Sequence, residues 1–62
     1  MNTLYYCVTE EGKFRALRKV NEYECYEPIM LRNKFFDRKT MDGLFKVLSK
    51  HIPGAFCLKE VK

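Results

Sequence analysis

Apolar residues alternate with other residues over two stretches near the start of the chain. In TLYYCVT (3–9), every second residue from Leu4 is apolar and points to one side, which is typical of a β-strand. EEGK follows, and its Gly12 can take a positive φ. FRALRKV (14–20) then has a second strand-like composition. Two such runs joined by a short Gly-containing loop predict a β-hairpin.

The stretch from 21 to 36 has a less regular pattern. Asn21-Glu22 suits a turn, and Pro28 restricts any strand here to the edge of a sheet. IMLRNKFF (29–36) is apolar at both ends and polar in the middle. This pattern fits either a short edge strand or a second small hairpin. We expect a third strand within residues 23–32.

A helical pattern follows. The apolar residues that share one helical face are Met41, Leu44, Phe45, Leu48 and Ile52. Thr40 or Asp37 can cap the start of this helix by accepting a free backbone N–H. Pro53 biases the residue before it away from helix, so the helix should end near His51. AFCLKEV (55–61) then predicts a closing strand.

These elements predict an α+β fold in one domain, residues 1–62. We expect a small antiparallel sheet of three to four strands with one helix packed on one face, in the order β-β-(β)-α-β. The expected core consists of Leu4, Tyr6, Val8, Ala16, Val20, Leu44, Phe45, Leu48, Phe56 and Leu58. A chain of 62 residues buries only about 60% of its unfolded surface. It leaves little room for a deep active-site cleft.

Charge and cysteine content narrow the range of functions. The net charge is +4, and residues 31–62 hold eight bases against three acids. A basic field attracts nucleic acid and acidic protein surfaces alike. The three cysteines are widely spaced and contain no C-x-x-C pair, which indicates reduced, mostly buried thiols in the cytoplasm. The N-terminus lacks the pattern of a signal peptide and no stretch resembles a membrane span, so we expect no membrane partner.

The sequence shows no recognisable combination of catalytic residues. His51 is the only histidine and Ser49 the only serine. Two residues apart on a helix, they do not face each other. A pairing of His51 with Cys57 across the turn is conceivable, but a buried cysteine is usually inert packing. We therefore expect a protein that is not an enzyme and that uses no cofactor or metal.

Two binding functions remain, and in both the partner is a macromolecule. For a protein-binding module, the expected contact residues are Tyr23, Glu24, Glu27, Arg32, Lys34, Arg38 and Lys39. Charges of both signs on a small body suit specific docking. For a nucleic-acid-binding protein, an open sheet face would present Tyr5, Arg15, Lys19 and Tyr23. Pairing of a free edge strand in a homodimer is a further possibility.

The C-terminal third, LFKVLSKHIPGAFCLKEV, resembles the end of the small phage-encoded inhibitors of bacterial RNA polymerase. Those proteins have a β-β-α-β layout with a helix, a turn and a closing strand. The resemblance covers about a third of the chain, and the first half does not match. It implies a compact, non-enzymatic regulator or inhibitor of a host protein, acting in the host cytosol.

Overall fold

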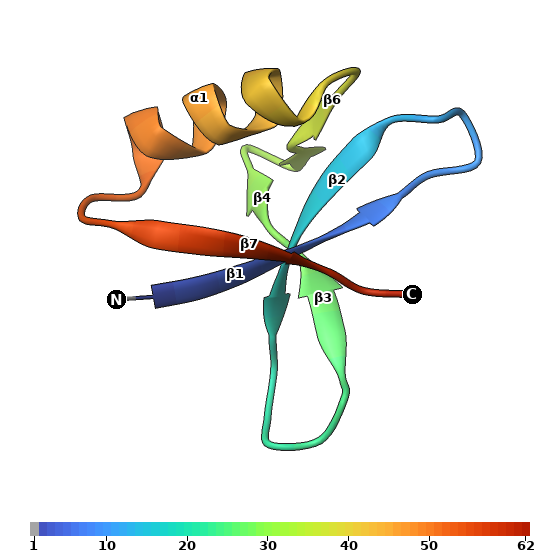
Figure 1. Cartoon of the computed structure of the whole chain (residues 1–62), viewed down its shortest axis with the longest axis vertical. Helices are drawn as coiled ribbons and strands as arrows, with labels where there is room; N and C mark the ends of the chain where they lie inside the picture. The colour runs from blue at the N-terminus through green and yellow to red at the C-terminus, as the bar shows by residue number, and fades with distance from the viewer. Residues whose placement is uncertain (1) are drawn as a thin grey trace.

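The computed structural model of the chain describes residues 2–62 (Figure 1). Its elements, in chain order, are β1 (Asn2–Val8), β2 (Phe14–Lys19), β3 (Tyr26–Pro28), β4 (Met30–Leu31), β5 (Lys34–Phe35), β6 (Asp37–Arg38), α1 (Met41–His51) and β7 (Phe56–Glu60). The predicted α+β class is confirmed: one helix lies across a mostly antiparallel sheet.

The main sheet has five strands, one more than expected. Its order is β3-β2-β1-β7, and β6 pairs with β2 beside β3. The expected hairpin of β1 and β2 is present, with Gly12 at φ 80° in its loop. In contrast to the fully antiparallel sheet expected, β7 runs parallel to β1. The reason is that α1 carries the chain back along the sheet before β7 begins, as in other parallel connections.

The helix α1 begins and ends close to where its sequence pattern predicted. Thr40, and not Asp37, is the N-cap: its side-chain oxygen accepts a hydrogen bond from the Gly43 N–H at 3.0 Å. The helix ends at His51. The turn before β7 contains Gly54 at φ 86°, a conformation that favours glycine.

The core lies between α1 and the sheet. Its buried residues are Ala16, Phe36, Leu44, Leu48 and Phe56. Leu4, Tyr6 and Leu58 are partly buried against them, as expected. Ala16, Leu44 and Leu48 have no exposed surface, so the middle of β2 and one face of α1 form the centre of the fold.

Three residues of the expected core are exposed instead. Val8 is 52% exposed, Val20 55% and Phe45 44%. An eleven-residue helix spans about 17 Å, whereas the seven-residue β1 spans about 23 Å. The helix therefore leaves strand ends uncovered. Phe45 lies at the flank of α1, where its ring stacks on Phe56 at 4.7 Å.

Residues 29–36 form the second small hairpin, with β4 and β5 paired as a separate two-stranded sheet. Arg32 and Asn33 at its tip have φ values of 52° and 63°, as in the type I′ turn of two-residue hairpins. The hairpin leaves the main sheet at a single point on β2. There the Ala16 N–H donates to the Phe36 carbonyl at 3.1 Å, and the Ile29 N–H donates to the Ala16 carbonyl at 3.0 Å.

Two further predictions concerned membrane-spanning segments and the state of the cysteines. Over residues 2–62, no helix is long and apolar enough to cross a membrane. All three cysteines are free; Cys7 and Cys57 are half-buried. Cys25 is exposed, so the expectation of buried thiols is wrong for this residue, which lies in the loop between β2 and β3.

Candidate functional site

Exposed apolar side chains gather on hairpin 30–35. Met30 is 49% exposed, Leu31 43% and Phe35 43%. Met30 and its cross-strand partner Phe35 share one face of the hairpin, and Leu31 lies on the opposite face with Lys34. Large apolar side chains that cluster on the surface mark interaction sites more often than isolated ones do. This hairpin is therefore the strongest candidate for a docking element.

A hollow of about 290 Å³ lies between this hairpin and α1, and we call it the hairpin groove. Among the residues that line it are Arg32, Lys34, Phe36, Arg38, Val47 and His51. The His51 ring lies 5.6 Å from the Phe36 ring. The groove thus has aromatic and aliphatic side chains beside several cationic ones.

The cations around the hairpin groove are not neutralised. In residues 2–62, the ion pairs are Arg15–Asp37, Arg18–Glu27 and Lys46–Asp42. None of them includes Arg32, Lys34 or Arg38. Asp37 is the only acid between residues 29 and 41, and its carboxylate is held by Arg15. The groove therefore carries a net positive charge.

Arg15 and Asp37 connect the hairpin to the sheet. The Arg15 Nε lies 2.8 Å from Asp37 Oδ1, and Nη2 lies 2.9 Å from Oδ2, a bidentate arrangement. The Arg15 guanidinium also lies 4.1 Å from the centre of the Phe35 ring. The hydrogen bond from Arg15 lowers the pKa of Asp37 below its ordinary value of 3.8. The same bond raises the pKa of Arg15.

Replacing Asp37 with asparagine should lower the free energy of unfolding at neutral pH by about 1 kcal/mol, because it removes a charged, half-buried pair. A carboxyl whose pKa is depressed in the folded state stabilises the protein above its unfolded pKa. That stabilisation is lost as the pH falls through the folded pKa. Urea unfolding of both proteins should therefore converge below pH 3.8. Asp42→Asn is the control, since its 89% exposed carboxylate should contribute little.

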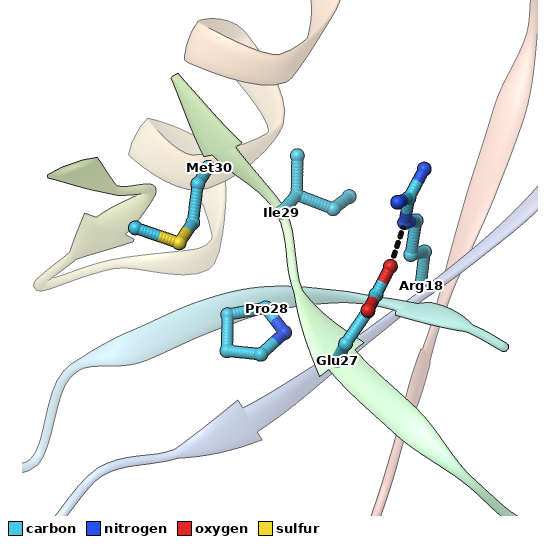
Figure 2. Close-up of a pocket in the computed structure, with 5 residues that line it drawn as sticks. All are labelled: Arg18, Glu27, Pro28, Ile29 and Met30. Carbon is cyan, nitrogen blue, oxygen red and sulfur yellow. Dashed lines mark hydrogen bonds and ion pairs between the residues drawn. The ribbon is translucent and has the colours of Figure 1, made fainter. Parts of the chain in front are cut away.

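The acidic residues of the expected contact set do not line the hairpin groove. Tyr23 and Glu24 are in the exposed loop between β2 and β3, at the opposite end of the molecule from α1 (Figure 1). Glu27, on β3, bonds Arg18 at 2.5 Å across a hollow lined also by Pro28, Ile29 and Met30 (Figure 2). Glu27 thus shares a hollow with Met30 of the hairpin, whereas Glu24 lies in a different part of the molecule.

The basic members lie together. Arg32, Lys34 and Arg38 line the hairpin groove, and Lys39 is exposed directly after β6. The sequence predicted this basic stretch as a contact surface but did not connect it with α1, and its contact with a partner stays a prediction. Val47 and His51 were not expected there, and Leu31 and Phe35 were not expected to be exposed. The one sequence feature that indicated this hairpin was the polar pair Arg32-Asn33, which has the length of a two-residue hairpin turn.

The structure brings together only some of the residues that were expected to bind nucleic acid. Tyr5 and Lys19 lie on the sheet face away from α1, as the β1–β2 and β2–β3 registers show. Tyr23 is in the loop, 74% exposed. Arg15 shares the face with Tyr5, but its guanidinium is engaged by Asp37 and Phe35. This leaves fewer free cations on the open face than the sequence suggested.

No family model, curated protein or solved structure matches this chain. The resemblance of its C-terminal third to phage-encoded inhibitors therefore stays a prediction.

Proposed function

We propose that this protein is a non-enzymatic protein-binding module that docks a partner protein through hairpin 30–35. The observation that carries this proposal is the exposure of Met30, Leu31 and Phe35 on one projecting hairpin, next to unpaired cations. Interface centres favour apolar and aromatic side chains, and nearby charges select the partner. A role as a cytoplasmic, phage-encoded regulator or inhibitor of a host protein fits this design and the resemblance noted above.

The dimensions of the surface favour a macromolecule over a small molecule. The hollows at the surface measure about 220 to 420 Å³, at or near the lower limit of small-molecule pockets. They are shallow and open. A hollow of this kind accommodates one or two side chains of a partner, while the rest of the partner lies across the surrounding surface.

Nucleic-acid binding is the second candidate, and the open sheet face supports it. The rings of Tyr5 and Tyr26 lie 4.9 Å apart there. Lys19 and Lys59 are on the same face as these rings, next to them in register. Aromatic rings with neighbouring cations can stack bases and hold phosphates. With Arg15 engaged by Asp37, this face has fewer free cations than the region of the hairpin groove.

Replacing Leu31 with serine should abolish capture of the partner while the domain stays folded, because Leu31 is exposed and its loss changes stability by no more than about 0.5 kcal/mol. The measurement is affinity capture from nuclease-treated host lysate with wild type and variant. We expect one dominant protein with the wild type and a loss of at least about tenfold with Leu31→Ser.

Val20→Ser is the matched control for this experiment. Val20 is also an exposed apolar residue, 55% exposed, but it lies at the end of β2 away from the hairpin. Capture should be unchanged in this variant. Equal losses in both variants would reject the hairpin as the docking element, and capture abolished by nuclease would favour nucleic acid.

A further inference from the structure

The hairpin groove has a charge pattern that specifies its occupant. Three cationic side chains, Arg32, Lys34 and Arg38, line it. No carboxylate is among its lining residues in the described chain. The nearest acid in sequence, Asp37, belongs to the pair with Arg15. Arg38 Nη1 already donates to the Asp37 carbonyl at 2.7 Å, but its charge, like those of Arg32 and Lys34, is in no ion pair. An occupant with negative charge would therefore meet three unpaired cations and no like charge.

The floor of the groove adds a second requirement. Phe36 is only 7% exposed and holds its place in the core, and Val47 is half-buried on α1. The His51 ring lies beside Phe36 at 5.6 Å, at the last turn of α1. Phe36 thus contributes only its edge to the accessible apolar surface, and Leu31, which also lines the groove and is 43% exposed, contributes more. A purely ionic ligand would leave this surface without a contact, whereas an aliphatic side chain would cover it.

We propose that the hairpin groove binds an acidic peptide segment of the partner, with one aliphatic side chain lying over Leu31 and Val47, beside the exposed edge of Phe36. Its flanking carboxylates pair with Arg32, Lys34 and Arg38. This inference rests on the proposed protein-binding function and specifies the chemistry of the partner. The small size of the groove, about 290 Å³, suits a single side chain. Arginine forks bind carboxylates in bidentate geometry, which adds orientation to the charge attraction.

A nucleic acid is a poorer fit for the same groove. One cation of the region, the Arg15 guanidinium, already lies 4.1 Å from the centre of the Phe35 ring. Of the aromatic rings that line the groove, Phe35 has one face covered by the Arg15 guanidinium and Phe36 is only 7% exposed, which leaves the His51 ring as the more accessible one. Binding of single-stranded nucleic acid usually relies on accessible aromatic faces for several bases. The groove therefore favours a carboxylate ligand with an aliphatic side chain over a nucleic acid.

The test uses synthetic probes and amide NMR shifts of the whole chain. One probe is a short peptide with a leucine flanked by glutamates, and its matched control replaces every glutamate with glutamine. Oligothymidine is the third probe. We expect the glutamate peptide to shift the amides of Phe36, Val47 and His51, and to bind roughly tenfold more tightly than the glutamine peptide. The affinity should fall as salt rises, because salt screens exposed charges.

Lys34→Glu is the variant that tests the groove itself. Lys34 is exposed on β5, so its charge reversal should leave the fold intact. It should weaken binding of the glutamate peptide by roughly tenfold or more. Lys59→Glu makes the same charge change on β7 and should leave peptide binding nearly unchanged. Equal weakening by both would show a general field effect and overturn the groove assignment.

Two other outcomes would also overturn the inference. The first is a set of peptide-induced shifts located elsewhere than Phe36, Val47 and His51. The second is tighter binding of oligothymidine than of the glutamate peptide at the groove. Either result would leave the capture experiment with Leu31→Ser intact as a separate test. If Leu31→Ser abolishes capture but the glutamate peptide fails to bind, the protein-binding function stands and only the acidic-peptide assignment falls.

Discussion

Replacing Leu48 with alanine is expected to lower the free energy of unfolding by about 2–5 kcal/mol. Leu48 has no exposed surface and belongs to the cluster that joins α1 to Ala16 on β2 and Phe56 on β7. Truncation removes buried methyl groups and leaves a cavity that the surroundings fill only in part. A chain of 62 residues has a total stability of about 3–9 kcal/mol, so this variant should lose roughly half of its stability.

Urea unfolding followed by circular dichroism measures this effect. Leu31→Ala is the matched control, because the same side chain is 43% exposed on the hairpin. It should change stability by no more than about 0.5 kcal/mol. A loss of similarly small size for Leu48→Ala would mean that α1 does not pack on the sheet through this residue.

The second large effect concerns two neighbouring phenylalanines. Phe36→Ala should destabilise the fold by about 3–5 kcal/mol, because Phe36 is 7% exposed and packs in the core. Phe35→Ala should cost only about 0.5–1 kcal/mol, mainly through its contact with the Arg15 guanidinium. Adjacent residues of the same type thus differ several-fold in their expected contributions.

The variants Phe35→Ala and Phe36→Ala also distinguish an effect on stability from an effect on partner binding. Denaturation midpoints give the stabilities, and affinity capture under conditions where each variant is folded gives the binding. Phe35→Ala should stay folded and lose capture, since Phe35 is exposed on the docking hairpin. If Phe35→Ala is the more destabilised of the two, the inward and outward sides of residues 35 and 36 are assigned wrongly.

Local patterns predicted the parts of the fold that depend on local physics. The alternation in 3–9, the helical spacing from Met41 to Ile52 and the break at Pro53 each placed an element to within about two residues. Thr40 was one of two candidate caps, and the choice between it and Asp37 needed the fold, because Asp37 pairs with Arg15 on a distant strand.

Features that depend on distant contacts were not predicted. The parallel pairing of β7 with β1 joins residues more than fifty positions apart. The fifth strand, β6, has only two residues, both charged, and its pairing with β2 is not visible in its composition. Phe36 was missed as a core residue because 29–36 fitted two alternatives, and only the hairpin alternative directs Phe36 inward.

The candidate site was predicted in composition but not in arrangement. The basic residues from Arg32 to Lys39 were expected to contact a partner, and the structure places three of them around one groove. Glu24 and Glu27 were expected on an acidic surface at an edge strand or its loop, apart from the basic one. The chain between 27 and 32 turns away from the sheet, so these two groups face different regions. Burial of Phe36, and hence the groove floor, required the tertiary structure.

The attachment of the hairpin at Ala16 has an evolutionary consequence. The residues on either side of the hairpin, Ile29 and Phe36, bond the two backbone groups of one residue on β2. The ends of the intervening segment are thereby held next to each other, whatever its length. The entropy of closing a loop depends only weakly on its length. Residues 30–35 should therefore be able to vary in sequence and length over evolution without altering the register of the sheet that carries them.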